Sequence, residues 1–140
     1  LFCALSHLDV IRKFDRKNGA GESVYFRDVE KLIEERSLRV LEKLAERGMA
    51  LELNTAGFDM PLGRAYLTPG MLAVAVELGV PVALGSDAHF PHQLGRHFGA
   101  ACRMLEDAGC EKLVTFVEGE MKEYYWRETE VGSAPHPAGS

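Results

Sequence analysis

The alternation of short apolar runs with segments of helical periodicity constrains the fold of this chain more than any other feature. Glycines at 48, 79 and 109 stand where three helices are expected to end, and Thr68 and Pro69 are typical of a helix start. In chain order the expected elements are a strand at 2–6, a helix at 29–44, a strand at 49–54, a helix at 69–78, a strand at 80–85, a helix at about 93–108 and a strand at 112–117. This order predicts an α/β fold of parallel strands joined by right-handed crossovers.

Length and composition limit the kinds of protein that this chain can be. With 140 residues, 46% of them hydrophobic, it can build one domain with a core, and a second domain is not expected. The net charge of -5 and the pI near 5.5 argue against a protein that coats nucleic acid. No apolar run is long enough to span a bilayer and no signal peptide is recognisable, so we expect a cytoplasmic protein without a membrane partner.

The two ends of the sequence differ from the rest. The chain opens on Leu1 and runs directly into an apolar segment that is typical of a strand, so we expect a fragment or a processed piece. Residues 131–140 hold prolines and small residues without apolar periodicity, which predicts a disordered tail. We therefore expect residues 1–130 to belong to a single domain.

Polar side chains follow three of the expected strands. "SHLD" follows the first strand, Glu52 and Asn54 end the second, and "SDAH" follows the third. In an open α/β sheet and in a (β/α) barrel alike, functional residues lie beyond the carboxyl ends of the strands. Because alternate side chains of an extended segment share a face, we expect three pairs to point the same way. The pairs are His7 with Asp9, Glu52 with Asn54, and Asp87 with His89.

Carboxylates and imidazoles at one sheet edge favour a divalent ion such as zinc, manganese or iron. The sequence has no glycine-rich phosphate loop, and Ser86 lacks the setting of a catalytic serine. Several roles stay open at this point. Asp9 could be a ligand, a partner of His7 or a helix cap, and Glu52 could face the polar edge or form a buried ion pair. Structural roles are favoured for His92 and His97, and packing of a final helix is favoured for the aromatic residues 124–126.

Three blocks, "SHLDVIRKF", "LELNTAGF" and "GVPVALGSDAHFPHQLGRHF", together resemble the PHP (polymerase and histidinol phosphatase) superfamily, and most closely its histidinol-phosphate phosphatases. The resemblance covers Phe2 to Tyr124. It implies the carboxyl-terminal part of a distorted seven-stranded (β/α) barrel, a TIM-like fold with two or three divalent metal ions at its strand ends. By resemblance His7, Asp87 and His89 are metal ligands.

The chain also departs from the family's pattern. The family's His-x-His motif and its second motif are not found in this sequence, so the resemblance implies a missing amino-terminal half as a partner. Phe58 and Asp59 stand where many relatives have a basic pair. Arg64 is therefore the candidate for binding a substrate phosphate, with Asn54 as a second expected substrate contact.

The function implied by the resemblance is hydrolysis of a phosphate monoester, with histidinol phosphate of histidine biosynthesis as the substrate. Asp87 and His89 would be the catalytic residues, and the fragment alone is expected to be inactive. Two alternatives remain open: another PHP-type phosphoesterase or nuclease, and a PHP-like binding module without catalysis. The sequence also leaves the formation of a homo-oligomer open.

Overall fold

The computed structural model describes residues 3–127 of the chain. Three strands, β1 (Ala4–Leu5), β2 (Ala50–Asn54) and β3 (Val82–Gly85), form a parallel sheet in the order β1-β2-β3. Three helices connect or follow them: α1 (Glu30–Arg47), α2 (Pro69–Glu77) and α3 (Phe98–Asp107). Short 3-10 helices are η1 (Val10–Arg12), η2 (Arg27–Val29), η3 (Thr55–Asp59) and η4 (Pro91–Gln93). The predicted α/β class with parallel strands is confirmed for this part of the chain.

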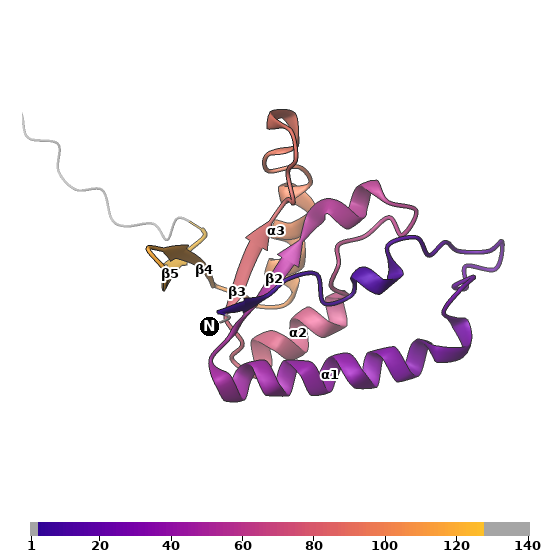
Figure 1. Cartoon of the computed structure of the whole chain (residues 1–140), viewed down its shortest axis with the longest axis horizontal. Coiled ribbons are helices and arrows are strands. Elements are labelled where there is room, and N and C mark those ends of the chain that lie inside the picture. The colour runs from indigo at the N-terminus through magenta and orange to yellow at the C-terminus, as the bar shows by residue number, and fades with distance from the viewer. Residues whose placement is uncertain (1–2, 128–140) are drawn as a thin grey trace, which may run out of the picture.

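The core lies between the parallel sheet and its helices. α1 and α2 run side by side next to the sheet, and α2 also contacts α3 (Figure 1). Leu51 and Leu53 of β2 point into this core and are fully buried, together with Leu41 of α1, Leu72 of α2 and Leu105 of α3. Because side chains alternate along a strand, Glu52 and Asn54 point away from the leucines.

The helix boundaries follow the residues that predicted them. The Thr68 side chain accepts a hydrogen bond from the Met71 N–H, and Pro69 is the first residue of α2. α1 ends at Gly48, whose φ of 60° lies in the left-handed region that glycine adopts without a steric cost. Both predicted boundaries are confirmed.

The predicted helix at 93–108 begins later than expected. Gly95 (φ 70°) and His97 (φ 58°) adopt left-handed conformations that a continuous right-handed helix excludes. The segment therefore forms η4, a connecting loop and then α3, and His97 is the residue before α3 instead of a residue within it.

The fourth apolar run does not join the parallel sheet. It forms β4 (Lys112–Val117), which pairs antiparallel with β5 (Glu120–Tyr125) in a separate two-stranded sheet. Glu118 (φ 52°) and Gly119 (φ 83°) connect the two strands, and two such residues are typical of a type I′ hairpin turn. The prediction of a fourth parallel strand was therefore wrong.

The aromatic residues near the end of the chain also differ from their prediction. Tyr124 and Tyr125 belong to β5 and not to a final helix, and the Trp126 Nε1–H donates a hydrogen bond to the Cys110 carbonyl at 2.6 Å. The sheet of the described residues does not close into a barrel. The predicted tail at 131–140 lies outside the described residues, and no helix within 3–127 has the length and apolar character needed to cross a membrane.

Gly57, in η3 directly after β2, provides a test of packing near the end of the sheet. A Cβ at this position would lie 2.2 Å from the Arg64 carbonyl oxygen and 3.2 Å from the Tyr66 ring. Because a main-chain carbonyl cannot rotate away, we expect Gly57→Ala to lower the free energy of unfolding by about 1–3 kcal/mol. Urea denaturation measures the change. Gly99→Ala is the control, since its added Cβ would meet no atom within 4 Å apart from its chain neighbours and the backbone of its own helix. Equal loss of stability in both variants would contradict the prediction.

Candidate active site at the carboxyl ends of the parallel strands

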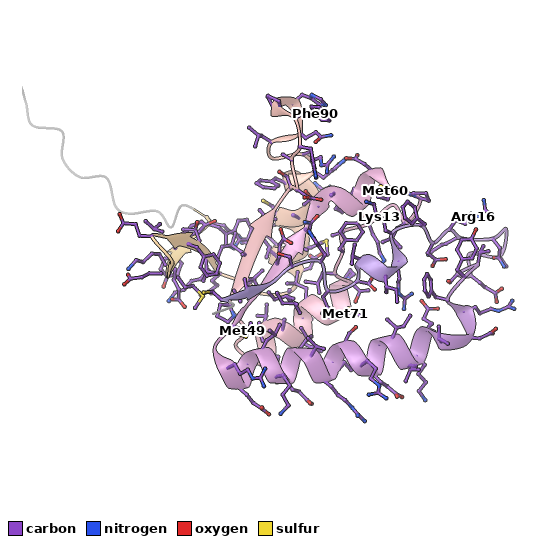
Figure 2. The ribbon with its side chains drawn as sticks, viewed as in Figure 1. Lys13, Arg16, Met49, Met60, Met71 and Phe90 are labelled. Carbon is purple, nitrogen blue, oxygen red and sulfur yellow. The ribbon has the colours of Figure 1, made fainter. Side chains whose placement is uncertain are left out.

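Three polar residues lie at one edge of the parallel sheet, at the points where its strands end. His7 follows β1, Asn54 is the last residue of β2, and Asp87 follows β3. The register aligns these strands in parallel, so their carboxyl ends meet at the same edge. The loop after β3 extends away from α1, with Phe90 near its far end (Figure 2).

The backbone at two of these residues has an uncommon conformation. His7 has a φ of 54° and Asp87 a φ of 48°, both in the left-handed region. For residues other than glycine this costs about 1–3 kcal/mol each, and such strain gathers at functional sites. The two residues are also the strand-end positions that the sequence singled out as metal ligands.

These left-handed residues limit the predicted alternation of side chains. Within β2 the alternation holds, because Glu52 Oε2 and Asn54 Nδ2 lie 3.2 and 2.9 Å from the same atom, His7 Nδ1. Beyond the strand ends the chain is no longer extended, so the prediction that His7 and Asp9 point the same way from an extended segment was wrong. Asp87 and His89 still lie together, with His89 Nδ1 4.0 Å from Asp87 Oδ1 and 2.9 Å from the Asp87 carbonyl oxygen.

Asn54 fixes the orientation of the His7 ring. The Asn54 side chain is fully buried, and its Oδ1 accepts a hydrogen bond from the Ala56 N–H at 2.9 Å. Its Nδ2 therefore faces His7 and donates to Nδ1, which leaves the proton of a neutral ring on Nε2. Asn54 was predicted to contact substrate, and the structure gives it this partly buried contact to His7.

Glu52 brings a carboxylate to the same imidazole. Its Oε2 is buried and accepts no hydrogen bond from the described residues, although it lies 3.2 Å from His7 Nδ1. A Cβ on Gly85 would lie 2.1 Å from Glu52 Oε1, so the glycine leaves the space that this carboxylate occupies. The lone pairs of Nδ1 and Oε2 repel each other unless a proton or a cation lies nearby.

Asp9 occupies the N-cap position of η1, but its side chain makes no capping hydrogen bond and lies in an ion-pair cluster instead. It is fully buried between two guanidinium groups, with Oδ1 3.2 Å from Arg12 Nε and Oδ2 in an ion pair with Arg64 Nη2. Arg12 Nη1 also donates to Glu30 Oε1 at 2.7 Å. Asp9 therefore joins the segment after β1 to the start of α1 and to the loop that carries Arg64.

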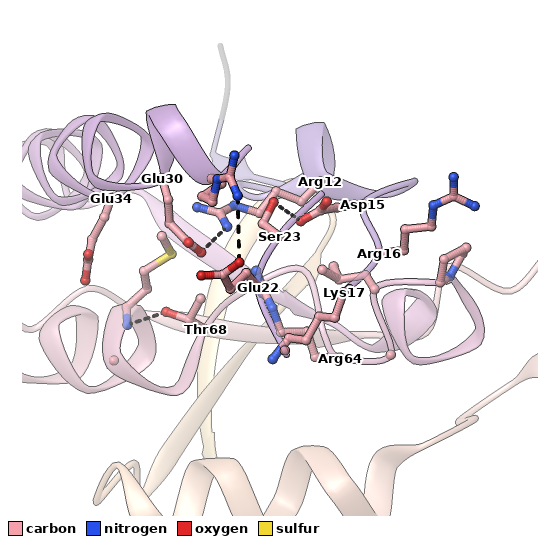
Figure 3. A pocket seen from close by; sticks show the side chains of 17 residues that line it. Arg12, Asp15, Arg16, Lys17, Glu22, Ser23, Glu30, Glu34, Arg64 and Thr68 are labelled. Carbon is pink, nitrogen blue, oxygen red and sulfur yellow. Dashed lines mark hydrogen bonds and ion pairs between the residues drawn. The ribbon is translucent and has the colours of Figure 1, made fainter. Parts of the chain in front are cut away.

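A cleft of about 800 Å³ lies beside this ion-pair cluster, between the segment 12–34 and the start of α2 (Figure 3). Of the predicted site residues only Arg64 lines it. The Arg64 guanidinium is held by Asp9 and by the Ala65 carbonyl oxygen at 3.0 Å. Five basic side chains of the cleft face four acidic ones, so their charges largely cancel. The basic residues are Arg12, Arg16, Lys17, Arg27 and Arg64, and the acidic ones are Asp15, Glu22, Glu30 and Glu34.

The two remaining histidines of the loop after β3 have separate surroundings. His92 is exposed and stacks on the Phe90 ring with 5.8 Å between ring centroids. His97 Nε2 lies 2.6 Å from Asp59 Oδ1. This hydrogen bond from His97 is the main reason that the pKa of Asp59 lies below its ordinary value, and the charges of His97 and Arg96 act in the same direction.

Comparisons with known proteins agree with the resemblance read from the sequence blocks. The chain is 36% identical over 122 residues to a probable histidinol-phosphatase of Deinococcus radiodurans, an alignment that covers 87% of this chain and 42% of that protein. It is 28% identical over 121 residues to a histidinol-phosphatase of Lactococcus lactis, covering 80% of the chain and 45% of the relative. The chain is similar in sequence to histidinol-phosphatases. The predicted resemblance is thereby confirmed.

Other relatives carry a broader name. A probable phosphatase of Caldanaerobacter subterraneus is 36% identical over 110 residues, which cover 77% of this chain and 40% of that protein. No protein-family model matches the chain. The chain spans about two fifths of the length of these histidinol-phosphatase and phosphatase relatives.

The donor set of this histidinol-phosphatase-like chain is suited to a metal but is divided into pairs. Within residues 3–127, no three His, Cys, Asp or Glu side chains converge on a point that could hold one ion. Carboxylate and imidazole donors instead occur as Glu52 with His7, and Asp87 with His89. Glu52 belongs to β2 and His7 follows β1, whereas Asp87 and His89 both follow β3. His7, Asp87 and His89 therefore do not form a three-ligand group in this structure.

Proposed function

We propose that this chain forms part of a metal-dependent phosphatase that hydrolyses phosphate monoesters, with histidinol phosphate as the substrate. The observation that carries the proposal is the placement of His7 and Asp87 in left-handed conformations at one sheet edge. Each stands beside a second donor, Glu52 or His89. The printed names of the relatives support the reaction type, and they support histidinol phosphate for those relatives that are called histidinol-phosphatases.

The roles of the residues follow from their contacts. Asp87 and His89 would hold one side of a site for two or three divalent ions of zinc, manganese or iron, and His7 would hold another side. Asn54 keeps the His7 ring in place, and Glu52 adds negative charge beside it. When bound, such ions supply a hydroxide near neutral pH and stabilise the charge that develops on the phosphate and the leaving group. The substrate contacts of Arg64 and Asn54 stay predictions.

The proposal also includes a second part of the molecule. The relatives are more than twice as long as the aligned region, and the donors described here do not complete a site. We propose that a segment corresponding to the rest of the relatives completes the (β/α) barrel and supplies the remaining ligands. Below, the intact protein means this chain together with that segment.

A non-catalytic binding module is the second candidate, and the division of the donors into two pairs favours it. One experiment separates the two. The intact protein is stripped with a chelator and assayed with histidinol phosphate, p-nitrophenyl phosphate and an oligonucleotide, before and after addition of Mn²⁺, Zn²⁺ or Fe²⁺. We expect loss of histidinol phosphate hydrolysis on chelation and its return with metal. Absence of turnover with every metal would favour the binding module, and preferred hydrolysis of the oligonucleotide would indicate a nuclease.

A further inference from the structure

Arg96 contacts the backbone on both sides of the strained peptide at Asp87. Its Nε donates to the Ser86 carbonyl oxygen at 3.0 Å, and its Nη2 donates to the Asp87 carbonyl oxygen at 3.2 Å. Its Nη1 lies 3.0 Å from Asp59 Oδ2. All three guanidinium nitrogens therefore have an acceptor, and the side chain is only 19% exposed.

This arrangement leaves the Asp87 carboxylate available. Arg96 takes the main-chain oxygens of the segment, and the Asp87 side chain is exposed, with His89 Nδ1 as its ion-pair contact among the described residues. A left-handed conformation at a residue other than glycine persists only when its surroundings determine it. The guanidinium fork supplies such a constraint, because its planar nitrogens fix two successive carbonyl groups relative to each other.

Other contacts hold Arg96 itself in place. The Thr55 hydroxyl donates to the Arg96 carbonyl oxygen at 2.7 Å, and the Ser86 hydroxyl accepts a hydrogen bond from the Gly95 N–H at 3.3 Å. Asp59 binds the Arg96 guanidinium through one oxygen and His97 through the other. Aspartate is ionised at neutral pH, and because the pKa of Asp59 lies below its ordinary value the ion pair with Arg96 also persists at more acidic pH.

We propose that Arg96 and Asp59 are a positioning pair that fixes the backbone of Ser86 and Asp87 and so directs the Asp87 carboxylate toward the metal site. The proposal rests on the proposed function. It also gives Asp59 a role, although this residue stands where a basic residue is expected in many PHP relatives. Arg96 acts through Asp87 and not on the substrate, because its nitrogens are already engaged.

The test combines a backbone signature with a metal titration of the full 140-residue chain. In NMR spectra, the coupling between the amide and α protons of Asp87 and its ¹³C shifts report the left-handed conformation. Mn²⁺ broadens the resonances of nearby residues, so its half-effective concentration at His89 measures binding. Loss of a group that orients a metal ligand typically costs about 10- to 100-fold in affinity. We expect Arg96→Ala to abolish the left-handed signature and to raise this concentration at least about 10-fold, with a smaller effect in Asp59→Asn.

A control variant and a stability measurement distinguish a positioning role of Arg96 from a general loss of structure. Arg103→Ala removes an exposed arginine of α3 and should leave the signature and the titration unchanged. Thermal unfolding of each variant identifies a global loss of structure. If Arg96→Ala is unfolded, the Asp87 signature and the Mn²⁺ titration of Asp59→Asn, which keeps the shape of the side chain, decide the role of the pair. An unchanged Asp87 signature in folded Arg96→Ala would overturn the proposal. If Mn²⁺ fails to broaden His89 in the wild-type chain, Asp87 and His89 do not hold an ion without the further segment, and the Asp87 signature by itself decides the role of Arg96.

Discussion

Replacing Asp87 with asparagine should lower the hydrolysis of histidinol phosphate by the intact protein about 100-fold or more, with little change in its thermal unfolding. The substitution removes the negative charge of a proposed metal ligand and keeps the shape of the side chain. Loss of a group that merely supports a ligand already costs up to about 100-fold. Asparagine also tolerates left-handed backbone, so the φ of 48° at this position should persist. Turnover is measured with saturating Mn²⁺.

The matched control for this variant is Asp107→Asn. Asp107 is an exposed aspartate at the end of α3, far along the chain from the strand-end donors. It should retain the wild-type rate, which shows that loss of one negative charge does not by itself slow the reaction. Wild-type turnover by Asp87→Asn at saturating metal would remove Asp87 from the proposed site.

The elements that sequence predicted correctly are those fixed by local chemistry. The Thr68 cap, the left-handed Gly48 and the leucines of β2 each act on neighbours within a few residues, so their effects can be read from the chain alone. The pairing of β4 was missed because an apolar run does not reveal its partner strand. The Glu118–Gly119 pair was a weak signal of a hairpin turn, because the residues that follow it alternate poorly in polarity.

The candidate site divides in the same way. The alternation of side chains along a strand correctly placed Glu52 and Asn54 on the same face, because both residues lie inside β2. It failed for Asp9, because the left-handed residue His7 turns the chain before it. Arg96 and Asp59 were not singled out as a pair, since 37 positions of sequence separate them and only the folded chain brings them together.

The open side of strand β1, next to α1, indicates where a further segment would pack. β1 is one of the two edge strands of the parallel sheet, and its Leu5 lines an apolar groove together with Val40, Leu44 and Met49. Four basic side chains of α1 border this groove: Arg36, Arg39, Lys43 and Arg47. An exposed edge with apolar surroundings favours pairing with another strand. We therefore expect the segment that completes the barrel to pair with β1 and to bring acidic residues to this border.

The 140-residue chain alone should hydrolyse histidinol phosphate at least about 1,000-fold more slowly than the intact protein. Its described donors form two pairs and no group of three, and a pair holds an ion too loosely to keep several ions at bridging distance. Removal of a single preorganised charge-stabilising group already costs about 100- to 1,000-fold. The assay compares the chain, the intact protein, and the chain mixed with the missing segment as a separate polypeptide. The mixture should regain turnover, and the same mixture made with Asp87→Asn should not. Turnover by the monomeric chain at the rate of the intact protein would show that these two donor pairs rearrange into a working site without further ligands.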